Sequence, residues 1–558
     1  MANSALSNFL RRNSDLALDF CVSASFVLAL CLFFEPRWET NDDVGMSMVA
    51  HGYGIAAVGL PNLVFSNVIW GYLVRAIPQI HGVWGYSIAT IGVLVIVGTV
   101  FLRALRQLSF GWLVSLSALI LLLARPFLFP QFTINAGLLT LGAVICWHFY
   151  GQQESRQALV IGCLLAFCGY LVRSHEFLLV LLIALPLLPW KKLVRDPAAQ
   201  ASAIALLLAI GIAAFVDYKA YQGDAWQSFN ALNPARAPIT DFGADAQLKK
   251  HPEILTRHGY TANDINLIRS WFFVDENIAN PHRLNAMLMD LGPLPAQSNA
   301  INNGWIGVKT FVHPVLVPSI LAALFLLLLM PNRKLFVTWA LCIAAIFALG
   351  VLGRPGVLRV YIPVISLLLI APLLLTSTGY GVRGTGYGVR GTGYGVRGTG
   401  ILRWGLVQGA IVVAALFNAA AVFSESRAAQ LVSQQIREEL QDFPDTTVVV
   451  WGSAFPFEAA YPVLGQKEDA VMYKLYGLGV FTLAPFSVAH AEEMVGRGVV
   501  DRLFSDHGIP ILGADHLFGF LNTYCDEHWS GVLVELASQK YGQRHVSWRR
   551  CETKVGQR

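Results

Sequence analysis

Two adjacent carboxylates, Asp42 and Asp43, end the stretch Glu39-Thr40-Asn41-Asp42-Asp43, which follows the first long apolar run. Ionisable groups at a membrane edge are unfavourable unless they are paired or used in function. Because neighbouring carboxylates repel each other, the pKa of one can rise into a range that suits proton transfer. The pair is therefore a candidate catalytic base, acceptor-orienting group or metal ligand. It also suits a helix N-terminus, where carboxylates meet free N–H groups, and the two interpretations are compatible.

A second set of residues lies at predicted helix ends and could bind an anionic substrate. A guanidinium group holds phosphate through two hydrogen bonds, so several arginines at one face indicate an anion site. The alternative is that each arginine extends to lipid phosphates, as most arginines at membrane helix ends do. His175 and Glu176 could assist proton transfer or simply pair with Arg173. The candidate substrate-binding residues are Arg125, Gln131, Arg173, His175, Glu176, Arg354 and Arg359.

The composition indicates a polytopic membrane protein. Of the 558 residues, 55% are hydrophobic and 13% charged, whereas soluble domains carry roughly 25% charged residues. A membrane-spanning helix needs about 20 apolar residues. We therefore predict an all-α membrane domain over residues 1–423, with about eleven transmembrane helices. The predicted spans are 16–34, 84–102, 109–124, 132–149, 157–173, 176–190, 200–217, 309–330, 335–352, 359–376 and 403–423.

Loop charges predict the orientation in a cytoplasmic (inner) membrane. Lys and Arg gather in the loops on the N-terminal side of the predicted membrane, which places the N-terminus in the cytoplasm. The first outer loop, 35–83, contains an apolar stretch at 63–78 that polar residues and proline interrupt, and we expect this stretch to lie on the outer membrane face. A Gly-rich cytoplasmic loop is predicted at 377–402, where residues 378–398 are a perfect triple repeat.

Two large polar regions are predicted on the outer side. One is the loop 218–308, and the other is the C-terminal region 424–558, which is long enough for an extracytoplasmic domain. Cys525 and Cys551 lie in this region and are a candidate disulfide if it is extracytoplasmic. Apolar patterning in the C-terminal region predicts an α/β module with helices at 425–442 and 488–498, a strand at 446–451, and short strands near 509–513 and 531–535.

These features together resemble the C-type (GT-C fold) integral membrane glycosyltransferases, which use polyprenyl-phosphate-linked sugars. Glu39–Asp43 resembles the acidic motif in the first outer loop of that family. Gln131-Phe132-Thr133 and residues 354–363 (RPGVLRVYIP) look like segments of uncharacterised bacterial members. The resemblance covers roughly residues 10–425, and the C-terminal region lies outside it.

The resemblance implies a hexosyl- or pentosyltransferase and assigns roles to the candidate residues. Asp42 or Asp43 would be the catalytic base or the acceptor-orienting carboxylate. Arg125, Arg173, Arg354 and Arg359 would contact lipid phosphate. The implied partners are a polyprenyl-phosphate-linked sugar, membrane lipid, and a glycan, lipid or protein acceptor, with no nucleic acid. The acids are adjacent and do not form the Asp-x-Asp arrangement linked to metal in some relatives, so no metal ligand or cofactor is assigned and a divalent cation stays an open option.

Two other classes of function compete with glycosyl transfer. A transporter or flippase for polyprenyl-linked glycans would predict charged residues inside the spans and internal repeats. The spans hold few charges, and the two halves of the chain show no similarity. A non-catalytic partner in cell-envelope polysaccharide assembly would use residues 424–558 to bind another protein.

Overall fold

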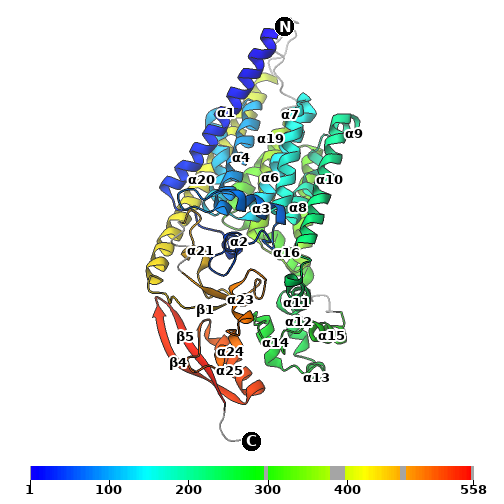
Figure 1. The fold of residues 1–558 in the computed structure, drawn as a ribbon. Helices are drawn as coiled ribbons and strands as arrows, with labels where there is room; N and C mark the ends of the chain where they lie inside the picture. The colour runs from blue at the N-terminus through cyan, green and yellow to red at the C-terminus, as the bar shows by residue number, and fades with distance from the viewer. Residues whose placement is uncertain (1, 294–298, 377–395, 466–472, 554–558) are drawn as a thin grey trace, which may run out of the picture.

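The computed structural model describes residues 2–293, 299–376, 396–465 and 473–553, which form a helical bundle and a polar domain at one end of it (Figure 1). The N-terminus lies at the opposite end of the bundle from the polar domain. The bundle contains α1 (Ala2–Phe33), α4 (Gly85–Gln107), α5 (Trp112–Leu128), α6 (Phe132–Gln153), α7 (Arg156–Val172), α8 (Ser174–Ala184), α9 (Trp190–Arg195), α10 (Pro197–Ala220), α16 (Ala300–Lys309), α17 (Val317–Leu329), α18 (Arg333–Val351), α19 (Leu358–Thr376) and α20 (Val396–Glu439).

The bundle helices make this chain a multi-pass membrane protein. Among the described residues, seven helices are long and apolar enough to cross a membrane: Ser14–Phe33 of α1, α4, α6, α10, α18, Leu358–Leu375 of α19, and Arg403–Glu439 of α20. The pair Ala300–Val312 and Val317–Leu329 is bent by 89°, as in a broken span or a re-entrant loop, and it brings the count to eight if the two helices form one span. All eleven predicted segments fall in apolar helices, but three of these helices are short: Trp112–Leu128, Arg156–Val172 and Ser174–Leu187. The predicted count of eleven spans is therefore not confirmed, and the segment 309–330 includes the bend.

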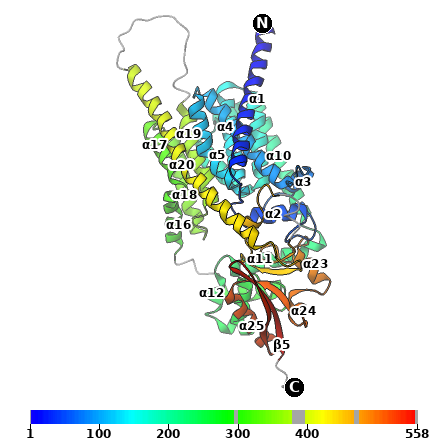
Figure 2. The ribbon, with the colours of Figure 1, turned by 90° about the vertical axis from the view of Figure 1, so that its left-hand side faces the viewer.

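The stretch after the first span forms two short helices, α2 (Asn41–His51) and α3 (Val68–Ala76). With nine residues, α3 is too short to cross a bilayer. This agrees with the prediction that 63–78 does not span. Both helices lie where the bundle meets the polar domain (Figures 1 and 2).

The loop 218–308 supplies five helices to the polar domain: α11 (Asp224–Thr240), α12 (Ala244–Leu248), α13 (Pro252–Arg257), α14 (Ala262–Arg269) and α15 (Pro281–Leu291). The C-terminal region supplies a sheet of β1 (Val448–Trp451), β2 (Leu475–Leu478), β3 (Ile509–Leu512), β4 (Gly531–Tyr541) and β5 (Arg544–Thr553). Its helices are α21 (Phe457–Ala460), α23 (Val488–Met494), α24 (Val499–Leu503) and α25 (Asp515–Trp529). The predicted α/β pattern is therefore present, although β2, β5 and α25 were not predicted.

The sheet has the strand order β2-β1-β3-β5-β4. β1 pairs with β2 and β3 in parallel, whereas β3–β5 and β4–β5 are antiparallel. In a parallel arrangement of this kind, ligands bind beyond the carboxyl ends of the strands. The loops that follow β1 and β2 therefore lie where a sheet of this kind binds its ligands.

The two polar regions share one hydrophobic core. Ile265, Phe272 and Leu284 of the loop pack in the same cluster as Trp451 and Tyr524 of the C-terminal region. The predicted boundary at 423/424 falls inside α20, which continues unbroken from the bundle to Glu439. Of the predicted Gly-rich loop 377–402, residues 377–395 lie outside the described residues, and the chain is helical from Val396.

The first loop joins the polar domain to the bundle. Gly54 forms a parallel β-bridge with Lys474, and Ala56 forms an antiparallel one with Ser487. The amide of Leu475, the first residue of β2, donates to the carbonyl of Gly54 at 3.2 Å. Because these bonds are between backbone groups, they hold the start of β2 and the loop after it against the segment that follows α2.

Candidate functional site

The two acidic residues singled out in the sequence lie in the first turn of α2, as the N-terminal interpretation predicted. Asp43 is fully buried and is held by three donors. One of its oxygens, Oδ1, accepts from the Tyr86 hydroxyl at 3.0 Å and from the amide of Phe132 at 3.0 Å, and Oδ2 accepts from the Thr40 hydroxyl at 3.2 Å. Phe132 is the first residue of α6, so this carboxylate ties α2 to α4 and to the start of α6.

Burial raises the pKa of Asp43 well above its ordinary value, and the negative charge of Asp42 raises it further. The hydrogen bonds from Tyr86, Phe132 and Thr40 act in the opposite direction. The raised pKa matches the expectation that one acid of an adjacent pair is perturbed. Because Asp43 has no exposed surface and three partners, its position suits a structural anchor better than contact with substrate.

Asp42 has a different environment, because it is only partly buried and faces a pocket. Its Oδ2 accepts from Nη1 of Arg359 at 2.9 Å. The pocket is formed by the start of α2 and by the residues that follow β1 and β2. The residues that line it are Asn41, Asp42, Gly45, Ile55, Val450, Gly452, Phe457, Gly477, Leu478, Gly479, Val480, Phe481 and Ser487. A carboxylate and a guanidinium group thus meet beside the carboxyl ends of two parallel strands.

Arg173 and Glu176 extend the charged group toward the bundle. Nη1 of Arg173 donates to the carbonyl of Phe65 at 3.1 Å, and its guanidinium lies over the rings of Phe65 and Phe132. Arg173 interacts electrostatically with Asp42 and Arg359. Glu176 is buried, and its Oε1 has no hydrogen-bond partner among the described residues.

The remaining predicted residues divide into peripheral and structural ones. Arg354 and His175 are exposed, although Arg354 is close enough to Arg173 to interact electrostatically. Gln131 is fully buried, and its Oε1 accepts from the amides of Thr133 and Ile134 at 2.6 and 3.1 Å, which caps α6. Its Nε2 has no partner within the described part of the chain.

Arg125 is held by two carboxylates. Its Nη2 donates to both oxygens of Glu39 at 3.1 Å, and its Nη1 donates to Glu425 at 2.6 Å. These contacts join α5 to the first loop and to α20. Burial raises the pKa of Glu39, while the charge of Arg125 lowers it. Since two acids already neutralise this guanidinium, Arg125 is not available to bind an anionic substrate.

Several residues of the site were not predicted from the sequence. Tyr86 has no local signal, because its partner Asp43 is 43 positions away. Phe481 packs so closely on α2 that a Cβ added to Gly45 would lie 2.7 Å from its ring. In the sequence, the only sign of this contact is the glycine at position 45, within α2.

Asp42 and Asp43 do not form a metal centre with a third donor among the described residues. Their carboxylates are engaged by different partners, one by Arg359 and the other by Tyr86 and Phe132. In the same described ranges, the one group of three His, Cys, Asp or Glu residues that could hold a metal ion is Asp264, Glu527 and His528, in the polar domain.

Comparisons with protein-family models, with curated proteins and with solved structures found no match to this chain.

Proposed function

We propose that the protein is a membrane glycosyltransferase that moves a sugar from a polyprenyl-phosphate donor to a glycan, lipid or protein acceptor. The observation that carries the proposal is the Asp42–Arg359 pair. A carboxylate that lines a pocket stands 2.9 Å from a guanidinium group at the end of an apolar bundle. Such a pair suits a reaction in which a proton leaves an acceptor while negative charge develops on a phosphate.

In the proposed reaction an acceptor hydroxyl attacks the anomeric carbon of the donor sugar. A new glycosidic C–O bond forms as the bond between that carbon and the phosphate oxygen breaks. Asp42 takes the hydroxyl proton and later releases it to water. The bond electrons leave with the polyprenyl phosphate, whose charge is stabilised by Arg359 and Arg173.

Asp42 and Asp43 have different roles in this proposal. Asp42 is the residue placed to contact substrate, because it lines the pocket and is partly exposed. Asp43 positions α2 through its bonds to Tyr86 and Phe132. Glu176 is buried near Arg173, and its Oε1 has no partner among the described residues, so it is placed to act on Arg173 rather than to contact substrate.

The arrangement of the whole chain supports a reaction at the outer face of an inner membrane. The polar domain lies at the opposite end of the bundle from the N-terminus (Figure 1), and Cys525 and Cys551 form the disulfide that the sequence suggested. Disulfides persist in oxidising compartments outside the cytoplasm. The other cysteines of the chain are free and lie in bundle helices.

The proposal is tested by transfer of labelled sugar from a panel of polyprenyl-phosphate sugars in native membranes. Wild-type protein is compared with Asp42→Asn and with Asp224→Asn, a control that removes an exposed carboxylate from the first turn of α11. We expect Asp42→Asn to lower the rate by about 10²–10⁴-fold, as loss of a general base does. The control should leave the rate unchanged.

Transfer by Asp42→Asn at the wild-type rate would refute the role of this carboxylate. Absence of transfer by folded wild-type protein over a broad panel would favour the other two classes of function. These are a transporter or flippase for lipid-linked glycans and a non-catalytic partner in envelope polysaccharide assembly.

A further inference from the structure

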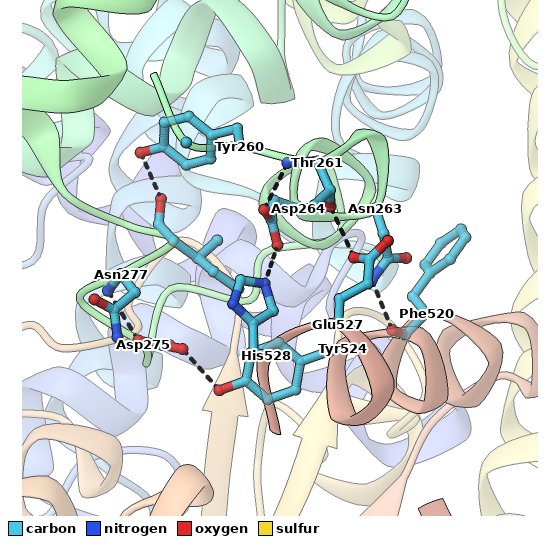
Figure 3. A network of polar contacts seen from close by, with 12 residues as sticks. Tyr260, Thr261, Asn263, Asp264, Asp275, Asn277, Phe520, Tyr524, Glu527 and His528 are labelled. Carbon is cyan, nitrogen blue, oxygen red and sulfur yellow. Dashed lines mark hydrogen bonds and ion pairs between the residues drawn. The ribbon is translucent and has the colours of Figure 1, made fainter. Parts of the chain in front are cut away.

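A cluster of metal-ligating side chains lies where α14 of the 218–308 loop meets α25 of the C-terminal region (Figure 3). Asp264 is held by a capping box at the start of α14. Its Oδ2 accepts from the amide of Thr261 at 2.8 Å, and its amide donates to the Thr261 hydroxyl at 3.1 Å. The second carboxylate oxygen, Oδ1, is directed at Nε2 of His528, 2.8 Å away.

Glu527 approaches the same place from the end of α25. Its Oε2 accepts from the Thr261 hydroxyl at 2.8 Å, so this one threonine contacts both acids. One ligand atom from each of Asp264, Glu527 and His528 lies within 4.8 Å of the other two. Asp264 is buried, whereas Glu527 and His528 are exposed. The Asp264 carboxylate is therefore held in place, and solvent can reach the other two ligands.

The charges around the cluster are unbalanced. The charged groups that act most strongly on His528 are all carboxylates: Asp264, Asp275 and Glu527. Asp275 is buried and accepts from the Tyr524 hydroxyl at 2.7 Å, on the other side of the His528 ring in Figure 3. Three carboxylates therefore surround one imidazole, and this excess of acidic donors suits a divalent cation.

We infer that Asp264, Glu527 and His528 form a binding site for a divalent transition metal such as Zn²⁺, which joins α14 to α25. One imidazole nitrogen with two carboxylates is a donor set that suits Zn²⁺, and water would complete a four-coordinate shell. Ca²⁺ and Mg²⁺ prefer oxygen donors alone. This site is separate from Asp42 and does not depend on the proposed transfer reaction.

The geometry needs only a small adjustment to hold an ion. Zn²⁺ lies about 2.0–2.2 Å from nitrogen and carboxylate oxygen ligands, so two ligands of a tetrahedral ion lie roughly 3.3–3.6 Å apart. The exposed Glu527 side chain can rotate to close the remaining gap. His528 would present an unprotonated Nε2 to the metal in place of its hydrogen bond to Asp264. The bond from the Thr261 amide would keep the Asp264 carboxylate oriented, as outer contacts do in metal sites.

A metal at this position would link segments that are 264 positions apart in the chain. α14 and α25 already share the second hydrophobic core. The ion would add three bonds on the solvent side of that core, where the contact between the two segments is otherwise a set of hydrogen bonds. We therefore expect the metal to stabilise the polar domain against unfolding.

The test is Zn²⁺ titration of the purified full-length chain in detergent, measured by calorimetry and by thermal unfolding. Glu527→Gln keeps an acceptor for Thr261 on an exposed side chain, so it should fold. His528→Ala removes the imidazole. The matched control is His516→Ala, an exposed histidine on the same helix.

Wild type and His516→Ala should bind one equivalent of Zn²⁺ that Glu527→Gln and His528→Ala bind about 10-fold or more weakly. Zn²⁺ should raise the unfolding temperature of the first two proteins and not of the others. The inference is overturned if wild type binds no Zn²⁺, or if both variants bind the same number of equivalents as wild type with the same affinity.

Discussion

Replacing Asp43 tests whether this buried acid is an anchor that needs no charge. Asp43→Asn retains Oδ1, which accepts from both Tyr86 and Phe132. The new amide group replaces Oδ2 opposite the Thr40 hydroxyl, which can turn and accept. Asp43→Ala instead leaves two buried donors without an acceptor.

The two substitutions should therefore differ strongly in stability. An unsatisfied buried donor costs about 1–3 kcal/mol, so Asp43→Ala should lower the free energy of unfolding by about 2–6 kcal/mol. Asp43→Asn should change it by about 1 kcal/mol or less. Thermal unfolding in detergent, followed by tryptophan fluorescence, measures both. Equal destabilisation by Asn and Ala would show that the charge is required and would refute the reasoning.

The same pair of proteins has a predicted pH dependence. An unfolded aspartate has a pKa of about 3.9, and burial raises the folded pKa of Asp43 well above that value. The folded state thus binds the proton more tightly, so the stability from this group is fully present below about pH 4. It is lost as the pH rises through the folded pKa. Wild type should lose stability relative to Asp43→Asn as the pH rises above about 4, and a constant difference would contradict this.

Three further outcomes are expected. Arg125→Gln should cost about 3 kcal/mol because it leaves the Glu39 side chain, which is only 14% exposed, without its partner. Glu425→Gln should cost under about 1 kcal/mol because the Glu425 side chain is 43% exposed. Unfolding of both variants measures the difference. Cys525→Ser should destabilise the polar domain by about 3.5 kcal/mol, since the disulfide closes a loop of 26 residues, and unchanged unfolding after reduction would contradict this. A fragment of residues 424–558 expressed alone should give no cooperative unfolding transition, because it lacks the loop helices of its core.

The bundle was largely predictable because a membrane helix leaves a simple record in sequence. Helix length and apolar composition located all seven of the described helices that are long and apolar enough to cross a membrane. The prediction of one span over 309–330 missed the bend of 89°, although Pro314 lies in the break and Pro318 at the start of α17, where proline disfavours a continuous helix. In the polar domain, β1 and β3 are short, fully buried and rich in apolar residues, and both were predicted.

β2 and β5 were not predicted because their sequences lack the apolar pattern of β1 and β3. β2 is only the four residues Leu475–Leu478 and contains a glycine. β5 reads RHVSWRRCET, so charged residues interrupt the alternation that marks a strand. It is stable because it lies between β3 and β4 in the sheet, a contact that only the fold provides.

The sequence identified the residues of the candidate site but not the partners that they contact. Asp42, Asp43, Arg173 and Arg359 were all identified from their types and their place at helix ends. The partner of Asp42 is 317 positions away, and that of Arg125 on α20 is 300 away. No local pattern could distinguish Arg125, which two acids neutralise, from Arg359, which pairs with a carboxylate that lines a pocket.

The composite nature of the polar domain explains why the pocket lies where it does. Its wall of residues after β1 and β2 comes from the C-terminal region, and its acidic side comes from the first loop. The two are fixed together by backbone bridges at Gly54 and Ala56, and the far side of the sheet is packed against the 218–308 loop. A shift of the loop helices would therefore move the sheet, and with it the pocket wall opposite Asp42. The proposed metal link between α14 and α25 would restrain that shift, because both helices share a hydrophobic core with the sheet. Each of the two proposals can still fail alone.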